Sequence, residues 1–147
     1  MPIKSFRGKL EHGTAGIEQI NLHTNDGRVG YRVKKMELLG VDLTGRDQES
    51  VFKVYSVPQT AADGVVDFSD PTLLAAGFYE QVASTSYFGD QIVVFDNVII
   101  NNDIYLTQDE AKGSHALNYH IELEQVILDL TENTTATLKN IRNAVQN

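Results

Sequence analysis

The longest regular pattern in this chain is the run from Asn118 to Leu130, in which apolar and polar residues alternate. Its first half has an apolar and a polar face, formed by Tyr119, Ile121 and Leu123 against His120, Glu122 and Glu124. A side-chain period of two is typical of a half-buried β-strand. The alternation slips once before Val126, Leu128 and Leu130 resume it. We therefore expect one long strand with a β-bulge inside it.

Shorter segments with strand-like patterns precede this run along most of the chain. The expected strands are Ile3–Leu10, Gly16–Thr24, Val29–Leu39, Val51–Val57, Leu73–Val82, Gln91–Phe95 and Ile104–Thr107. Val51–Val57 carries large apolar groups on both sides, which predicts that both of its faces are covered. The stretch Leu73–Val82 also fits a short helix, although we favour a strand.

Turn chemistry and composition narrow the fold further. Asp26-Gly27 between two strand-like runs is a strong hairpin signal, because a type I′ turn needs positive φ at both central residues. Eight or so short strands indicate an all-β chain, either a β-sandwich or a jelly roll. The chain has no Cys and no Trp, so it lacks the usual immunoglobulin pattern. We therefore predict a jelly-roll-like antiparallel β-sandwich over residues 1–130.

After Leu130 the period of the apolar residues changes from that of a strand to that of a helix. Leu138, Ile141 and Val145 lie at i, i+3 and i+7, with Ala144 on the same side. This stripe predicts a short amphipathic α-helix within residues 131–147, capped by Asn133 or a neighbouring Thr. We expect the stripe Leu138, Ile141, Ala144 and Val145 to pack on the sandwich or on a neighbouring subunit, since such a helix is weak alone.

Two long polar segments between the expected strands are candidate contact loops. Pro58–Pro71 is the longest irregular stretch, and Ala83–Asp90 is rich in Ser, Thr and Gly. Loops of about a dozen residues are uncommon in compact domains and often carry a function. Val65–Phe68 fits a short strand inside the first of them.

The composition excludes several classes of function. The chain has 147 residues, the length of one ordinary domain. Its net charge of −8 repels nucleic-acid phosphates. Its first ten residues lack the apolar core of a signal peptide, and no apolar run is long enough to span a membrane. Without cysteine it has neither disulfides nor thiolate metal sites. We expect no nucleic-acid partner, no membrane and no cofactor.

No catalytic or metal-binding motif stands out, and we predict that the chain is not an enzyme. Glu122 and Glu124 on one strand face resemble a glycosidase pair, but any solvated strand face offers the same spacing. The separation of His115 and His120 fixes no common metal geometry. Four oxygen-bearing residues could approach Ca²⁺, although turn chemistry explains them better: Asp96, Asn101, Asn102 and Asp103.

Three stretches of the chain together resemble small virion structural proteins of marine tailed bacteriophages. They are MPIKSFRGKL, VFDNVIINNDIYLTQDEAKGSHALNYHIELEQV and LDLTENTTATLKNIRNAVQN. The resemblance implies a β-sandwich that decorates a capsid or builds part of a tail, and it carries no catalytic residues. It also implies assembly in the host cytoplasm, location in the virion, and contact with major capsid or tail proteins.

An oligomer of identical subunits is the expected state of such a building block. A carbohydrate-binding jelly-roll module for host recognition remains the alternative function. That alternative predicts a concave cleft that holds Glu122, Glu124 or Tyr119 beside another aromatic ring. An interface formed by the loops would favour the structural function instead.

Overall fold

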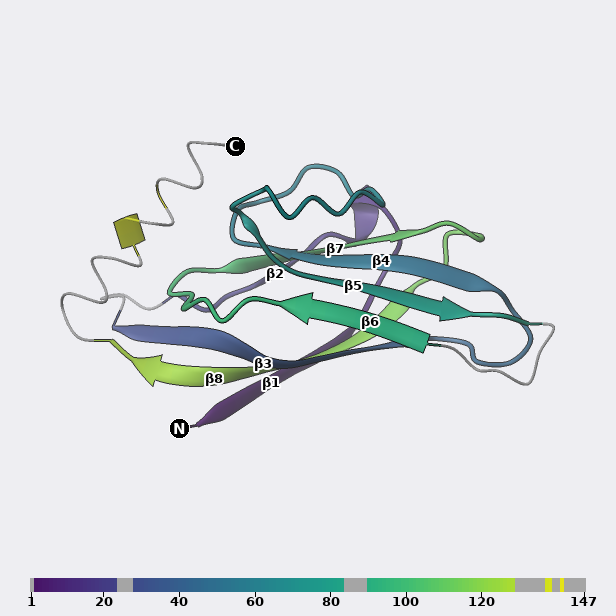
Figure 1. Ribbon diagram of the computed structural model, residues 1–147. Helices are drawn as coiled ribbons and strands as arrows, with labels where there is room; N and C mark the ends of the chain where they lie inside the picture. The colour runs from purple at the N-terminus through teal and green to yellow at the C-terminus, as the bar shows by residue number, and fades with distance from the viewer. Residues whose placement is uncertain (1, 24–27, 84–89, 129–136, 139–140, 142–147) are drawn as a thin grey trace.

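The computed structural model describes residues 2–23, 28–83, 90–128, 137–138 and 141. In these residues, eight strands form two antiparallel sheets that face each other as a β-sandwich (Figure 1). The strands are β1 Ile3–Leu10, β2 Glu18–Ile20, β3 Val29–Gly40, β4 Gln48–Tyr55, β5 Leu73–Gln81, β6 Asp90–Phe95, β7 Ile104–Glu110 and β8 Leu117–Ile127. A single 3-10 turn, Thr14–Gly16, lies between β1 and β2.

The strand order mixes early and late parts of the chain in both sheets. The three-stranded sheet has the order β1-β8-β3, and the five-stranded sheet has the order β2-β7-β4-β5-β6. The long strand β8 therefore lies in the middle of its sheet, paired on both sides over nearly its whole length. The predicted all-β class and the strand assignment of Leu73–Gln81 are confirmed.

The core lies between the two sheets and consists of the inward side chains of nearly every strand. Its fully buried members include Leu10, Phe52, Ile104, Leu106, Leu117 and Leu123. The rings of Phe52 and Tyr119 stack across the sandwich, 5.7 Å apart at an interplanar angle of 28°. Alternation in sequence produces this arrangement, because every second residue of a strand points to the same face.

The predicted bulge in the last strand is wrong in position, because the irregularity lies in β3. The β3–β8 register shifts between Val33 and Lys35, whereas β8 keeps a continuous register with β1. Gly30 lies opposite Val126 of β8, and a Cβ at Gly30 would meet Ile99 and Leu128. Apolar side chains thus surround Gly30 at the end of the sheet where the alternation in β8 slips.

Three further local predictions need correction. The strands that flank Asp26-Gly27 do not form a hairpin, since β2 pairs with β7 and β3 pairs with β8 in the other sheet. Residues 24–27 themselves lie outside the described part of the chain. Val65–Phe68 forms no strand, and β7 continues to Glu110, beyond its predicted end at Thr107. In each of these segments the conformation depends on which distant segment it pairs with, and a local residue pattern carries no information about that partner.

Both faces of β4 are covered, as its two apolar sides predicted. Phe52 and Val54 point into the core, while Lys53 and Tyr55 are also buried on the other face. The cover on that second face is the long loop of residues 56–72, which folds back over the five-stranded sheet. This loop positions the site described next.

Candidate functional site

A buried lysine fixes the loop of residues 56–72 to the outer face of the five-stranded sheet. Lys53 Nζ donates to Asp63 Oδ1 at 2.7 Å and to the Val65 carbonyl oxygen at 2.6 Å. Burial lowers the pKa of Lys53, but hydrogen bonds to Asp63 and Tyr55 outweigh it and hold the pKa above its usual value. The charged lysine therefore ties the loop to β4.

Apolar side chains remain exposed on this fixed loop and on the neighbouring edge strand β6. Phe68 is 70% exposed, and Val94 on β6 is 45% exposed. Val65, Val66 and Ile92 are exposed as well. A concentration of large apolar side chains on the surface of a soluble domain is typical of an interaction site.

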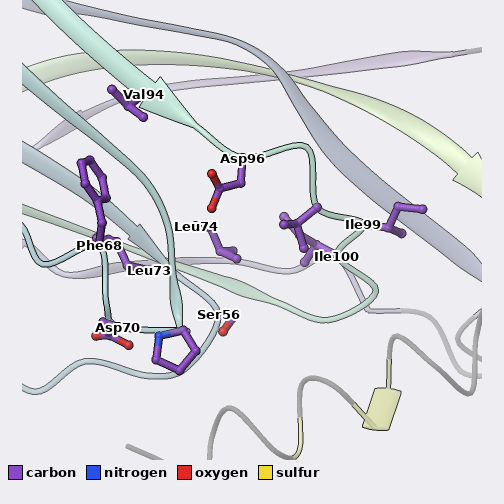
Figure 2. A pocket seen from close by; sticks show the side chains of 11 residues that line it. Ser56, Phe68, Asp70, Leu73, Leu74, Val94, Asp96, Ile99 and Ile100 are labelled. Carbon is purple, nitrogen blue, oxygen red and sulfur yellow. The ribbon is translucent and has the colours of Figure 1, made fainter.

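A hollow of about 450 Å³ lies between the end of this loop and β6, and Figure 2 shows its lining. Phe68 and Val94 stand on one side of it, and Ile99 and Ile100 on the other. Pro71, Leu73, Leu74 and Val98 complete its apolar lining. We call this hollow and its apolar rim the β6 hollow.

Three polar residues complete the β6 hollow. Asp70 and Asp96 line it from the loop and from the end of β6, respectively. The Asp70 carboxylate accepts hydrogen bonds from the backbone N–H and hydroxyl of Thr72, which fixes the turn before β5. The Ser56 hydroxyl oxygen is buried and has no hydrogen-bond partner among the described residues. The site therefore combines an apolar interior with acidic side chains.

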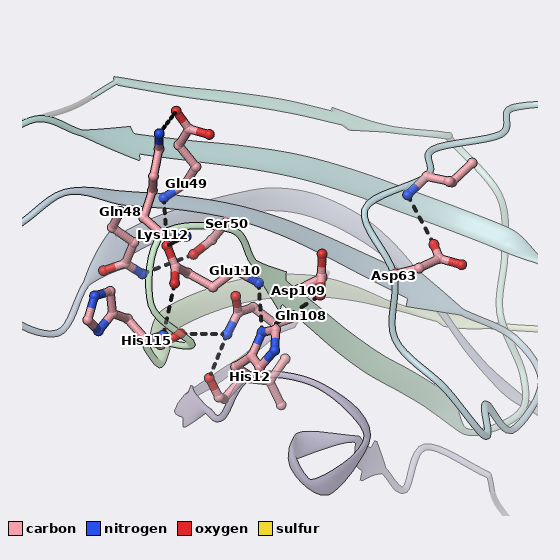
Figure 3. A network of polar contacts seen from close by, with 12 residues as sticks. His12, Gln48, Glu49, Ser50, Asp63, Gln108, Asp109, Glu110, Lys112 and His115 are labelled. Atoms are coloured by element: carbon pink, nitrogen blue, oxygen red, sulfur yellow. Dashed lines mark hydrogen bonds and ion pairs between the residues drawn. The ribbon is translucent and has the colours of Figure 1, made fainter.

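A second cluster, made of buried polar side chains, lies at the opposite end of β4 (Figure 3). The carboxylate of Glu110 accepts backbone hydrogen bonds from Glu49 at 3.0 Å, Lys112 at 2.8 Å and His115 at 3.0 Å. Burial raises the pKa of Glu110, but these hydrogen bonds outweigh it and lower the pKa below its usual value. The carboxylate therefore ties the segment of residues 111–116 to β4.

Glutamine side chains extend this polar cluster into the sandwich. Gln108 Nε2 donates to the carbonyl oxygens of Leu10 and His115, and Gln48 Nε2 donates to Ser50 and to the Ala116 carbonyl oxygen. Most groups that bond to the side chains of Gln48, Gln108 and Glu110 are backbone atoms. This pattern indicates a structural role, because catalytic groups need access to a substrate.

Glu122 and Glu124 do not face a cleft as a glycosidase pair would. Glu124 accepts two hydrogen bonds from the Arg32 guanidinium, and Glu122 lies opposite Lys35 on β3. The hydrogen bond from Arg32 holds the pKa of the Glu124 carboxyl below its usual value. A general acid needs a raised pKa. The arrangement matches cross-strand ion pairing on an outer sheet face.

The predicted oxygen-rich turn is organised around Asp103, which is largely buried. Its carboxylate accepts hydrogen bonds from the backbone of Leu22 and His23 and from the Gln19 side chain. Burial raises the pKa of Asp103, but the hydrogen bonds, led by the His23 side chain, lower it overall. Asn102 accepts a hydrogen bond from the Asp103 N–H, as turn chemistry predicts. Within the described residues, no group of three or more acidic or histidine side chains could hold a metal ion.

His115 and His120 belong to different surroundings. The backbone N–H of His115 joins the Glu110 network, whereas His120 lies between Arg7 and Glu37 on the outer face of the three-stranded sheet. Nothing in these surroundings brings the two imidazoles together as metal ligands.

Tyr119 does not form the sugar platform that the alternative function required. Its ring is buried against Phe52, and its hydroxyl donates to Glu18 at 3.0 Å. Burial, together with Glu18, raises the pKa of this hydroxyl far above its usual value. Tyr119 also lines an open groove with Arg7, Asn118 and His120, where it is the sole aromatic residue among those described.

The C-terminal stripe is partly described. Leu138 is 60% exposed and Ile141 is 57% exposed, while Ala144 and Val145 lie outside the described residues. Thr137 accepts a hydrogen bond from Asn101 Nδ2 at 3.0 Å, so the segment starts beside the sandwich. Thr137, Leu138 and Ile141 have helical conformation, whereas the extent of the predicted helix lies outside the described residues.

The sequence analysis did not single out Phe68 and Val94, the exposed apolar residues of the β6 hollow. The available signal was the run Ile92–Phe95, which is apolar on both faces of what proves to be an edge strand. Across the described residues, no helix is long and apolar enough to cross a membrane. Comparison of the chain with protein-family models, curated proteins and solved structures finds no match.

Proposed function

We propose that this chain is a non-enzymatic structural protein of a virion, either a capsid decoration or a tail component. The observation that supports this proposal is the β6 hollow, where Phe68 and Val94 remain exposed on a loop and strand held in place by buried contacts. A rigid apolar surface favours protein–protein contact, because ordering it on binding costs little entropy. The sequence resemblance supplies the virion context.

The same proposal includes a jelly-roll topology. A jelly roll wraps one long hairpin, so that strands pair first with eighth, second with seventh, third with sixth and fourth with fifth. Three of these pairings occur here, namely β1·β8, β2·β7 and β4·β5. β6 pairs instead with β5, although the Leu38 N–H donates to the Gln91 side chain at 2.6 Å. Jelly rolls recur among capsid proteins, which is consistent with the proposed role.

The partners in this proposal are other copies of the chain and the major capsid or tail proteins. The proposed setting is the virion, assembled in the host cytoplasm. Exposed sheet edges and the fixed loop of residues 56–72 would form the contacts. The net charge of −8 supports this choice of partners over nucleic acid, since it repels phosphates.

Light scattering on a sizing column, over a wide range of concentration, tests the proposed function. We expect a defined oligomer, and we expect the double variant Phe68→Ser, Val94→Ser to have a lower mass at equal concentration. Ile127→Ser is the matched control, because Ile127 is 65% exposed but lies on the other sheet. A monomeric wild type whose mass and stability do not respond to the double variant would contradict self-assembly through this surface.

Glycan binding remains the competing proposal, with the groove beside Tyr119 as its site. Polar side chains such as Arg7, Asn118 and His120 line this groove and could bind sugar hydroxyls. The burial of Tyr119 weakens this proposal, because sugar binding favours an exposed ring. Specific binding in a glycan screen that His120→Ala abolishes, from a monomeric protein, would replace the structural proposal.

A further inference from the structure

We propose that the β6 hollow of one copy of this chain receives the stripe residues Leu138 and Ile141 of a second copy. This inference rests on the proposed function and names the contact through which copies assemble. Leu138 and Ile141 are the described members of the C-terminal stripe.

The stripe and the hollow are both uncovered in the single chain. Leu138 is 60% exposed and Ile141 is 57% exposed, although Thr137 contacts Asn101 of the same sandwich. The segment is thus attached to its own copy without burying its apolar residues there. Since burying apolar surface is favourable, covering both surfaces at once favours association.

The point of attachment places the stripe near the edge that a neighbouring copy would approach. Asn101 directly follows Ile99 and Ile100, which line the β6 hollow. Each copy therefore presents its hollow and the start of its stripe from one region of the sandwich. A chain that carries both the hollow and the stripe can insert its stripe into the hollow of a neighbouring copy.

Charge complementarity selects a second copy of this chain as the occupant. Lys139 follows Leu138 and Arg142 follows Ile141, so the stripe segment is basic within a chain of net charge −8. Asp70 and Asp96 line the hollow that would receive it. Opposite charges at the rim of an apolar contact fix its orientation and favour one partner over others.

The geometry of such a contact has a consequence for assembly. The stripe and the hollow are different surfaces, so the contact is heterologous and leaves one stripe and one hollow free in every dimer. Heterologous contacts close into rings or extend as filaments. This outcome suits a repeated building block of a capsid or tail.

Cysteine cross-linking tests the contact directly, because the natural chain has no cysteine. The experiment mixes full-length Ile141→Cys protein with full-length Val94→Cys protein under mild oxidation. We expect a mixed disulfide dimer on a non-reducing gel, since a disulfide forms only where Cβ atoms approach to about 3.5–4.5 Å. Ile92→Cys is the matched control, because Ile92 is exposed on the same strand but does not line the hollow.

A double variant with both Val94→Cys and Ile141→Cys separates the possible occupants. A ladder of oligomers supports the proposal, whereas a cross-linked monomer that persists on dilution shows that the stripe binds its own hollow and overturns it. Equal yields with Ile92→Cys and Val94→Cys would also overturn it. If the wild type is oligomeric but no mixed disulfide forms, this contact fails while the proposed building block stands. A monomeric wild type without cross-links contradicts both.

Discussion

Single buried charges hold the loops of this protein in place. Glu110 fixes the segment of residues 111–116 to β4 through its carboxylate, and Lys53 fixes the loop of residues 56–72 through its ammonium group. Both groups are largely buried and hydrogen-bonded, which is the condition under which buried charge is tolerated. Their effect on stability is therefore measurable one residue at a time.

Glu110→Gln is expected to lower the free energy of unfolding by about 1–3 kcal/mol at neutral pH. The amide replaces one acceptor oxygen by a donor and leaves a backbone N–H unpaired. Chemical denaturation measures the change. Glu80→Gln on β5, which is half-buried, is the matched control and should change the stability by less than about 0.5 kcal/mol.

The ionisation of Glu110 should also make the free energy of unfolding depend on pH. The folded pKa of Glu110 lies below its ordinary value of 4.5, so its contribution is present above that pH and is lost as the pH falls through the folded pKa. Wild type should therefore lose stability on acidification more steeply than Glu110→Gln. Parallel slopes in denaturation series for the two proteins would show that Glu110 does not carry this dependence.

Asp63→Ala should release the loop of residues 56–72 from β4. The buried Lys53 ammonium would keep only the Val65 carbonyl and Tyr55 as partners, at a cost of about 1–3 kcal/mol. Proteolysis within this loop should become faster, as followed by mass spectrometry. Asp67→Ala is the control, because the Asp67 side chain in the same loop bonds only to Ser69 among the described contacts, and it should leave the cleavage rate close to wild type.

At the scale of elements, local alternation identified strands but not their partners. Ile3–Leu10 has the predicted bounds, and β8 covers most of the predicted run, from Leu117 to Ile127. The Asp26-Gly27 hairpin was wrong because the flanking strands enter different sheets. Strand pairing is decided by the closure of the whole sandwich, which brings together segments about a hundred residues apart, such as β1 and β8.

The central strand β8 should contribute strongly to stability through its inward side chains. Leu123→Ala is expected to cost about 2–5 kcal/mol, because Leu123 is fully buried and its removal leaves a cavity. Ile127→Ala on the same strand is the control, and it should cost less than about 0.5 kcal/mol since Ile127 is 65% exposed. Urea unfolding compares the two; equal costs would mean that β8 does not pack as described.

At the scale of the whole molecule, the proposed assembly depends on the C-terminal segment. A chain that ends at Leu130 keeps all eight strands, so it should still fold. It should have a lower mass than the full chain by light scattering, because the stripe that carries Leu138 and Ile141 is missing. An unchanged mass together with an unchanged melting temperature would exclude a role for the stripe in assembly.

The sequence by itself determined the all-β class, most strand positions and the absence of recognisable catalytic motifs. These features depend on side-chain periodicity and residue chemistry, which are local. The tertiary structure alone decided the sheet order, the place of the bulge in β3, the ion pair of Glu124 with Arg32 on β3, and the β6 hollow. Each of these features requires contact between segments that are far apart in the chain. Such contacts depend on the packing of the complete sandwich.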